Sequence, residues 1–227
     1  MKRLAFLLIF GLGGAAILIS LGIWQVQRLA WKQGVIADID ARIAADPVPL
    51  PAQLDPTTDA YLPVTVTGTF SGPFLQVLVS QKQKGAGYRI ITPFVMQDRT
   101  ILIDRGFVPV DEAPETGGIA PQVIQTIVGN LQWPQETDGF TPEPDLAKNI
   151  WFARDVPAMS KALGTDPILV VQREVSQASG PLTPLPVDTA AIPNDHLQYA
   201  ATWFSLAAIW SVMTFFFLRR RRGATKS

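Results

Sequence analysis

The chain has 227 residues, with 19 basic and 19 acidic side chains, so it carries no net charge at neutral pH. That balance gives no electrostatic reason to expect a nucleic acid as a partner. The sequence has no cysteine, which excludes disulfides, thiolate metal sites and covalent haem attachment through a Cys-x-x-Cys-His motif. Long apolar runs lie near both ends, and the residues between them suffice for one globular domain.

The first apolar run, residues 4–24, contains no charged side chain. At 1.5 Å per residue a helix of this length measures about 31 Å, which is enough to cross the hydrocarbon core of a bilayer. A cleaved signal peptide would share its basic start at Lys2 and Arg3. However, the run is longer than a usual signal-peptide core and lacks a small-x-small cleavage site at its end. The sequence therefore predicts an uncleaved transmembrane helix.

Residues 25–45 are predicted to form a juxtamembrane extension of this helix, which Asp46-Pro47 would end. Apolar residues recur along the extension at roughly helical spacing, at Leu29, Ile36, Ile39 and Ile43.

Residues 46–193 are predicted to form a single α+β domain of five to seven mostly antiparallel strands, with a partly closed barrel as one possible form. Alternating and β-branched patterns indicate the strands. A short helix with Asp155 as its N-cap and Gly164 at its exit should precede the last strand. The predicted strands are residues 64–67, 74–80, 88–96, 100–108, 123–131 and 168–174, and the loops rich in Pro, Gly and acidic residues are 111–118 and 133–144.

The second predicted transmembrane helix is residues 194–218, and a basic cytoplasmic tail, 219–227, follows it. Four consecutive arginines cross a bilayer poorly, and Lys2 and Arg3 hold the other end on the same side. Both termini are therefore expected in the cytoplasm, with the long domain exported. No Arg- and Ser-rich presequence comes before the first span, which favours a bacterial inner membrane and a periplasmic domain over a mitochondrial location.

Small residues at helical spacing in both spans predict close helix packing, either between the two spans or between one span and a partner. The pairs on the first span are Gly11 with Ala15 and Ala16 with Ser20, and the second span carries Ala201, Ser205 and Ala208.

The usual catalytic signatures are missing from the sequence. It has neither a Gly-x-Ser-x-Gly elbow nor a Gly-x-x-x-x-Gly-Lys phosphate loop. Asp104 beside Arg105 could be catalytic, but adjacent opposite charges on a strand are more often solvated or structural. An exported hydrolase is the remaining enzyme class, and the lack of a base near any serine argues against it. We therefore expect that the chain is not an enzyme.

The one histidine, His196, lies at the exported end of the second span. Asn194 can cap a helix starting there, which places His196 in the first turn. A helix N-terminus favours the neutral imidazole that binds metals, whereas Asp195 opposes it. Trp203 shares the helical face of His196, so one interpretation is an axial ligand to a porphyrin iron with Trp203 against the macrocycle. The alternative is an interfacial membrane anchor.

A second group of candidate residues follows the first span. Trp24, Arg28 and Trp31 share one helical face, with Lys32 beside them. They are either an aromatic belt with cations whose charged ends reach the membrane surface, or a clamp of Arg28 and Lys32 for an anionic ligand such as haem propionates.

Three segments together resemble a known family. They are Leu21 to Lys32, then Tyr88 to Phe94 with Asp104 to Pro109, and finally Asn194 to Phe204. Their order and the two-span layout resemble the surfeit-locus family of cytochrome c oxidase assembly factors over essentially the full chain.

The resemblance implies a non-catalytic chaperone with haem a as its cofactor, His196 as the iron ligand and Trp203 on the same face. It implies the oxidase catalytic subunit as partner, haem a synthase as a further partner, and the lipid bilayer as the surrounding medium. It assigns Arg105-Gly106 to domain integrity. The alternative function is a cofactor-free membrane scaffold that stabilises oxidase subunits during assembly.

Overall fold

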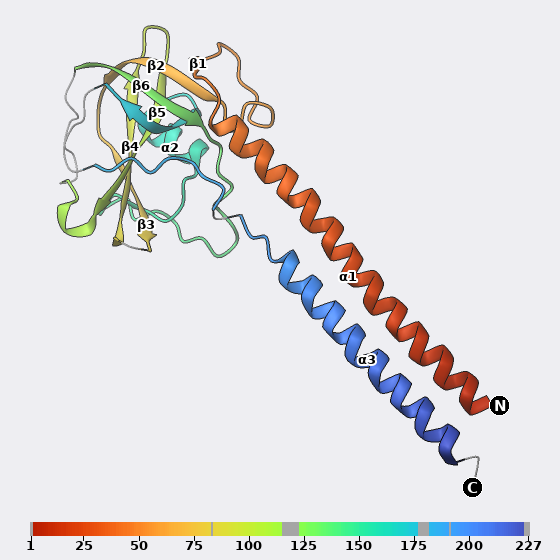
Figure 1. The fold of residues 1–227 in the computed structure, drawn as a ribbon. Coiled ribbons are helices and arrows are strands. Elements are labelled where there is room, and N and C mark those ends of the chain that lie inside the picture. Colours follow the sequence, from red (N-terminus) through yellow and green to blue (C-terminus); the bar gives the residue numbers. More distant parts are fainter. Residues whose placement is uncertain (1, 83, 115–122, 177–181, 191, 225–227) are drawn as a thin grey trace. The chain divides into compact units, whose positions relative to one another are not determined.

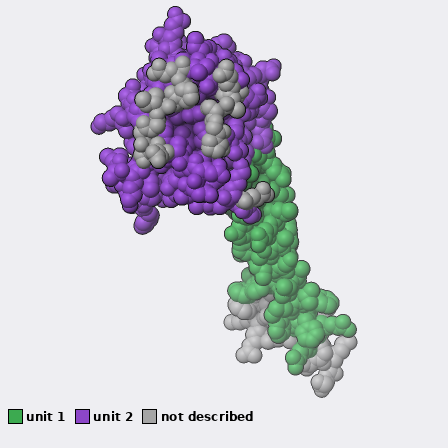
Figure 2. All heavy atoms as spheres, turned by 90° about the vertical axis from the view of Figure 1, so that its left-hand side faces the viewer, with its two compact units in different colours: residues 1–38, 189–227 green, residues 39–188 purple. Residues whose placement is uncertain are grey.

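The computed structural model describes residues 2–82, 84–114, 123–176, 182–190 and 192–224. The chain divides into two compact units (Figure 2). The helical unit comprises residues 1–38 and 189–227, and the barrel unit comprises residues 39–188.

The helical unit is a pair of long helices, α1 (Lys2–Ile43) and α3 (His196–Ala224), of which α1 continues into the barrel unit (Figure 1). Both are long and apolar enough to cross a membrane, over Leu8–Ile43 and His196–Arg220. The two helices run antiparallel, since Gly11 of α1 lies against Thr214 of α3, and Gln25 of α1 lies against His196. The two transmembrane helices at the termini are confirmed, and their antiparallel pairing places both chain ends at one end of the pair.

Glycines of α1 make the close approach of the two helices possible. A Cβ at Gly14 would lie 2.6 Å from Nε1 of Trp210, and a Cβ at Gly22 would lie 2.6 Å from the ring of Phe204. The Trp210 indole also donates a hydrogen bond of 2.9 Å to the carbonyl oxygen of Gly11. The helices therefore pack glycine against large side chains.

The small-residue stripe predicted on the second span does not form this contact. Ala201, Ser205 and Ala208 are exposed in the helical unit, whereas Ala200 and Ala207 are buried. The face of α3 toward α1 is thus offset by one residue from the predicted stripe. The reason is that the small partners in this pair come from α1.

The barrel unit is built on one sheet in the order β1-β2-β6-β8-β5-β4-β3-β7. An additional pairing of β2 with β4 closes a ring of the strands β2, β6, β8, β5 and β4, which confirms the barrel-like α+β prediction. The strands are β1 (Val48–Pro49), β2 (Pro63–Phe70), β3 (Leu75–Gln81), β4 (Gly85–Val95), β5 (Thr100–Pro109), β6 (Ile124–Leu131), β7 (Ile150–Trp151) and β8 (Leu169–Val175); a 3₁₀ turn, η1 (Val110–Glu112), follows β5.

The sheet has eight strands, where the sequence predicted five to seven. The two unforeseen strands, β1 and β7, have two residues each. Three pairings are parallel, namely β1 with β2, β3 with β7, and β5 with β8, and the other pairings are antiparallel as expected.

The short predicted helix is present as α2 (Val156–Leu163). The Asp155 side chain accepts a hydrogen bond of 3.0 Å from the amide of Ala158, and Gly164 ends the helix in the left-handed conformation at φ 66°. The apolar face of α2 packs on the sheet because Met159 lies in the core cluster that contains Leu102. A second cluster fills the ring of strands: Val64, Val66, Phe70, Phe94, Ile101, Ile103, Ile127, Leu131, Ile168 and Val170.

The barrel unit fixes the end of α1 through side chains. Asn130 on β6 donates to the carbonyl oxygen of Ile43 at 3.1 Å and to that of Tyr61 at 3.0 Å. Arg173 on β8 donates to the same Ile43 oxygen at 3.2 Å. The last carbonyls of a helix lack intrahelical partners, so these donors stop α1 at a defined place.

Gly106 on β5 is required by the segment that returns from the barrel toward α3. Its φ of 106° is a conformation that other residues rarely adopt, and a Cβ there would meet the backbone of Thr183 and Pro184. Thr183 and Phe107 exchange backbone hydrogen bonds of 2.8 and 2.9 Å. Glycine at this position lets the return segment lie directly on β5.

Candidate functional site

His196 is the first residue of α3, and its imidazole contacts α1. Nδ1 of His196 lies 2.8 Å from Oε1 of Gln25, whose side chain is buried. An amide oxygen only accepts, so Nδ1 must carry the hydrogen in this contact. The neutral ring then has its free lone pair on Nε2, which is the form that a metal ion takes.

The predicted cap of α3 is different in the structure. Because α3 begins at His196 and the amide of Tyr199 donates to the carbonyl of Asp195 at 3.2 Å, Asp195 occupies the N-cap position. The Oδ1 atom of Asn194 is buried and lacks a hydrogen-bond partner among the described residues. Asn194 therefore does not cap the helix as expected, although His196 does lie in the first turn.

Trp203 lies on the α3 face that meets α1. Its flanking neighbours on that face, Ala200 and Ala207, are only 3% and 5% exposed, and Trp203 itself is half-buried. Because α1 covers much of this face, a flat ligand at His196 has access only to the exposed part of the Trp203 ring. The sequence pattern could not show this restriction, since it did not place α1 there.

Arg28 and Lys32 follow Gln25 on α1 at helical spacing, so they lie on the same side of that helix. The guanidinium of Arg28 is 3.9 Å from the ring centroid of Trp31, and both side chains are exposed. Lys32 is half-buried. With a rise of 1.5 Å per residue, the two cations begin about 4.5 and about 10.5 Å along the helix axis from Gln25. They form a cationic strip leading away from the histidine.

Sequence reasoning missed Gln25, although it lies in the first quoted segment. The position of Gln25 in the sequence could have identified it. It is a polar residue just beyond the apolar run of α1, at the same end of the helix pair as His196. Pairing the two spans as antiparallel helices would have placed these residues side by side. The sequence left open whether the small residues pack the two spans together or pack one span on a partner, so it did not place these two residues as neighbours.

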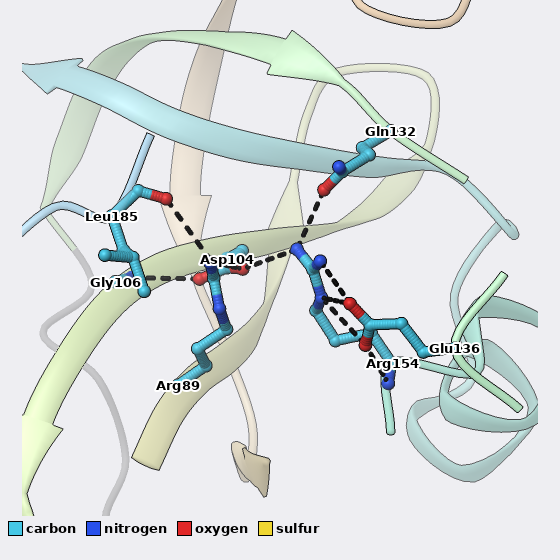
Figure 3. A network of polar contacts seen from close by, with 7 residues as sticks. All are labelled: Arg89, Asp104, Gly106, Gln132, Glu136, Arg154 and Leu185. Atoms are coloured by element: carbon cyan, nitrogen blue, oxygen red, sulfur yellow. Dashed lines mark hydrogen bonds and ion pairs between the residues drawn. The ribbon is translucent and has the colours of Figure 1, made fainter. Parts of the chain in front are cut away.

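A second polar constellation lies inside the barrel unit, around Asp104 on β5 (Figure 3). Asp104 is fully buried, and its Oδ2 contacts the guanidinium of Arg89 at 2.5 Å and that of Arg154 at 3.5 Å. Its Oδ1 accepts from the amide of Gly106 at 3.0 Å. Arg89 also donates to the carbonyl of Leu185, at 3.3 Å. The network thus joins β4, β5 and the return segment.

Arg154 connects this network to the loop that follows β6. It donates to Oε1 of Gln132 at 2.8 Å and makes a multidentate contact with Glu136, with a shortest distance of 2.5 Å (Figure 3). Burial alone would raise the pKa of Glu136, but the hydrogen bonds and charge of Arg154 outweigh burial and hold that pKa below its ordinary value. Burial would lower the pKa of Arg154, and Glu136 with Asp104 raises it.

These contacts settle the role of Asp104, which was expected to be solvated or structural. It is buried and fully engaged by two arginines and a backbone amide, so it is structural. Arg105 is also buried, and its guanidinium lies 4.4 Å from the ring centroid of Phe70. Desolvation lowers the pKa of Arg105.

The two units define a class of protein: one with a small barrel of mixed strands and a pair of terminal transmembrane helices. Residues 12–208 match the model of the SURF1 family. The chain belongs to the SURF1 family, which is known as a family of cytochrome c oxidase assembly factors. The resemblance of the three sequence segments to the surfeit-locus family is thereby confirmed.

Several relatives are similar over most of their length. Surfeit locus protein 1 of Rattus norvegicus is 35% identical and aligns with 90% of this chain and 73% of its own. The human protein of the same name is 34% identical, over 86% of this chain and 72% of its own. A SURF1-like protein of Monosiga brevicollis is 33% identical, over 90% and 84% respectively.

Proposed function

We propose that this chain binds haem a and assists its insertion into the catalytic subunit of cytochrome c oxidase, with His196 as the iron ligand. Membership of the SURF1 family supports the role in oxidase assembly. The observation that supports the cofactor is the hydrogen bond between Nδ1 of His196 and Oε1 of Gln25.

The donor set at this position suits a haem iron. Histidine is a common axial ligand of haem. A ligating histidine almost always donates its other ring hydrogen to an oxygen acceptor, which fixes the tautomer and raises the basicity of the ligating nitrogen. Gln25 provides that acceptor from a buried position, and Nε2 of His196 is left as the ligating atom. A bound haem would supply its iron, which is the cargo of the proposed transfer.

The cationic strip, Arg28 and Lys32, would bind the propionate end of the haem. Haem carries two propionate carboxylates, and Arg28 with Lys32 would bind them on the same side of α1 as Gln25. Arg28 keeps its exposed guanidinium stacked on Trp31, which orients the charge without burying it. The exposed part of the Trp203 ring would contact the apolar surface of the macrocycle.

The proposed setting is a bacterial inner membrane with the barrel unit on the periplasmic side. The basic residues at the end of α3 and at the start of α1 favour a cytoplasmic position for both termini. His196 then lies at the outer surface of the bilayer. Haem a synthase would provide the cofactor, and the oxidase catalytic subunit would receive it.

The test is the absorption spectrum of the protein purified from cells that make haem a. The wild-type chain should carry the pigment, and His196→Ala should lose it or shift its spectrum. Gln198→Ala is a matched control, because Gln198 is an exposed polar residue of the same helix turn. A His196→Ala variant that retains the pigment with an unchanged spectrum would remove His196 from this role.

The alternative is a cofactor-free scaffold that stabilises oxidase subunits. The exposed stripe of Ala201, Ser205 and Ala208 favours it, since α1 leaves these small residues free for a helix of a partner. Co-purification with the oxidase, without pigment and under haem a-producing conditions, would support the scaffold and exclude the cofactor proposal.

A further inference from the structure

The loop between β6 and β7 exposes large apolar side chains on the barrel unit. Phe140 is 93% exposed and Leu146 is 74% exposed. Residues 134–149 are an irregular loop with turns at both side chains. Burial of such side chains against a partner would remove apolar surface from water, which favours association. A loop with a fixed backbone would present these side chains to a partner at defined positions.

Both ends of the loop are anchored to the barrel. At its start, Trp133 donates from Nε1 to the carbonyl of Pro167 at 3.0 Å. The buried Arg154 holds Glu136 with its backbone amide at 2.9 Å and with its guanidinium. At the other end, the backbones of Asp145 and Ile150 exchange hydrogen bonds of 2.9 and 3.0 Å. Compact loops with closed ends of this kind are frequently functional.

The tip that carries Phe140 is itself fixed by hydrogen bonds. Oδ1 of Asp138 accepts from the amide of Phe140 at 2.9 Å and from the hydroxyl of Thr141 at 3.0 Å. The first of these bonds is the main reason why the pKa of Asp138 lies below its ordinary value. The backbone that carries Phe140 is thus held in an ordered turn, which reduces the conformational freedom that the loop loses on binding.

An acidic hollow lies beside this tip. Its lining includes the acidic residues Asp138, Glu143 and Asp155 and the aromatic residues Trp151 and Phe152. Trp151 is only 4% exposed, and its Nε1 has no hydrogen-bond partner within the part of the chain that the structure describes. The loop 134–149 contains four acidic residues and one basic residue, Lys148, which pairs with Asp145 at 3.4 Å. The surface therefore combines an outward aromatic group with a negative hollow.

We infer that the loop 134–149 is a docking surface for a protein partner that offers an apolar pocket for Phe140 and an arginine or lysine side chain for the hollow. Aromatic side chains that enter a pocket commonly dominate the affinity of an interface, and complementary charge sets its orientation. The negative charge argues for a basic protein surface and against the anionic surface of a membrane. The inference is independent of haem binding, and the family role only selects the partner to test.

The probe is the oxidase catalytic subunit, measured by its yield after purification of the tagged full-length chain from cells that express both. Phe140→Ser should reduce the yield by about tenfold or more, since hot-spot truncations commonly have effects of this size. Glu143→Lys should also reduce the yield, and raised salt should weaken the wild-type complex. Ile124→Ser is the matched control, because Ile124 is 73% exposed on β6 of the same unit. It should leave the yield unchanged.

The absorption spectrum separates this proposal from the haem proposal. Phe140→Ser should retain the wild-type pigment, whereas His196→Ala should retain the catalytic subunit. Thermal unfolding of each variant identifies any general loss of structure. The docking proposal is overturned if the wild-type chain does not retain the subunit, if Phe140→Ser and Glu143→Lys both keep the full yield, or if Ile124→Ser lowers it equally. If Phe140→Ser instead lost a homodimer with the yield unchanged, the surface would be assigned to a second copy of the chain. If it lost binding to phosphatidylglycerol vesicles with the yield unchanged, the surface would be assigned to lipid.

Discussion

Gln25 accepts a hydrogen bond from Nδ1 of His196 across 171 residues of sequence, and this contact selects the nitrogen that His196 can offer to a metal. The acceptor is buried and belongs to α1, while the histidine begins α3. The pairing of the two helices therefore determines the chemistry of the imidazole. A variant at Gln25 can test this relationship without removing the histidine.

Gln25→Leu should weaken haem binding by about 10-fold to 100-fold, which is the usual effect of losing the acceptor behind a ligating histidine. Without the amide oxygen, the ring no longer prefers the tautomer with a free Nε2. The measurement is a haem titration followed by absorbance at several pH values, since the variant should also change the pH dependence of binding. Gln25→Glu keeps an oxygen acceptor and should retain most of the affinity.

Gln27→Leu is the control for this comparison, because Gln27 is an exposed residue of the same type two positions along α1. It should bind haem as the wild type does. Equal affinities for Gln25→Leu and Gln27→Leu would show that the hydrogen bond has no part in presenting Nε2.

The contact between Gly14 and Trp210 gives a prediction on the helix pair itself. Gly14→Ala should destabilise the pair by about 1–3 kcal/mol, because the new methyl group overlaps the indole and displaces it from the Gly11 carbonyl. Gly13→Ala changes the same residue type one position earlier, where a Cβ meets nothing within 4 Å. It should be neutral or slightly stabilising. Unfolding in mixed detergent micelles, followed by tryptophan fluorescence, measures both, and equal stability of the two variants would contradict the predicted packing.

The sequence predicted six strands and α2 because their signals are local. β-branched alternation marks β2, and the capping residues Asp155 and Gly164 mark α2. The strands β1 and β7 have two residues each, which is too short for any periodicity, and they exist because β2 and β3 pair with them. The pairing of β2 with β4, which closes the barrel, also depends on tertiary contacts. The sequence alone therefore offered a partly closed barrel as one of several forms of the domain.

The candidate site was predictable only in part. His196 stands out as the one histidine, and Arg28 and Lys32 follow an apolar run. The partner of His196 and the burial around Trp203 come from the docking of α1 on α3, and the small-residue stripes left open whether the two spans pack together or one packs on a partner. In this pair the small residues are glycines of α1, which pack against side chains of α3, whereas the small-residue stripe of α3 is exposed.

The buried Asp104 gives a prediction on the stability of the barrel. Asp104→Asn removes the negative charge that Arg89 and Arg154 share, and breaking a buried ion pair in this way costs about 3–5 kcal/mol. Asp98→Asn is the control, since Asp98 is exposed and its ion pair with Arg99 at 3.5 Å should contribute less than about 1 kcal/mol. Urea unfolding of the full chain in detergent measures the difference. A loss in Asp104→Asn no larger than that in Asp98→Asn would mean that the arginines find other compensation.

The ion pair between Glu136 and Arg154 predicts a pH-dependent contribution to stability. The pKa of Glu136 is lowered below its ordinary value, so the folded state favours the ionised carboxylate more than the unfolded state does. The resulting stabilisation is fully present above the unfolded pKa and is lost as the pH falls through the folded pKa. Glu136→Gln should therefore be less stable than the wild type at about pH 7, and the difference should shrink at about pH 3.

Thr137→Ala, a change at an exposed neighbour in the same loop, is the control for this measurement and should show no such dependence on pH. Urea unfolding at each pH gives the free energies of unfolding, and a Glu136→Gln difference that stays constant between the two pH values would contradict the assignment. Because Glu136 also anchors the loop that carries Phe140, the prediction extends to the docking surface. Acid that protonates Glu136 should release the start of that loop and weaken retention of the oxidase subunit by the wild-type chain more than by Glu136→Gln, which lacks the titrating group.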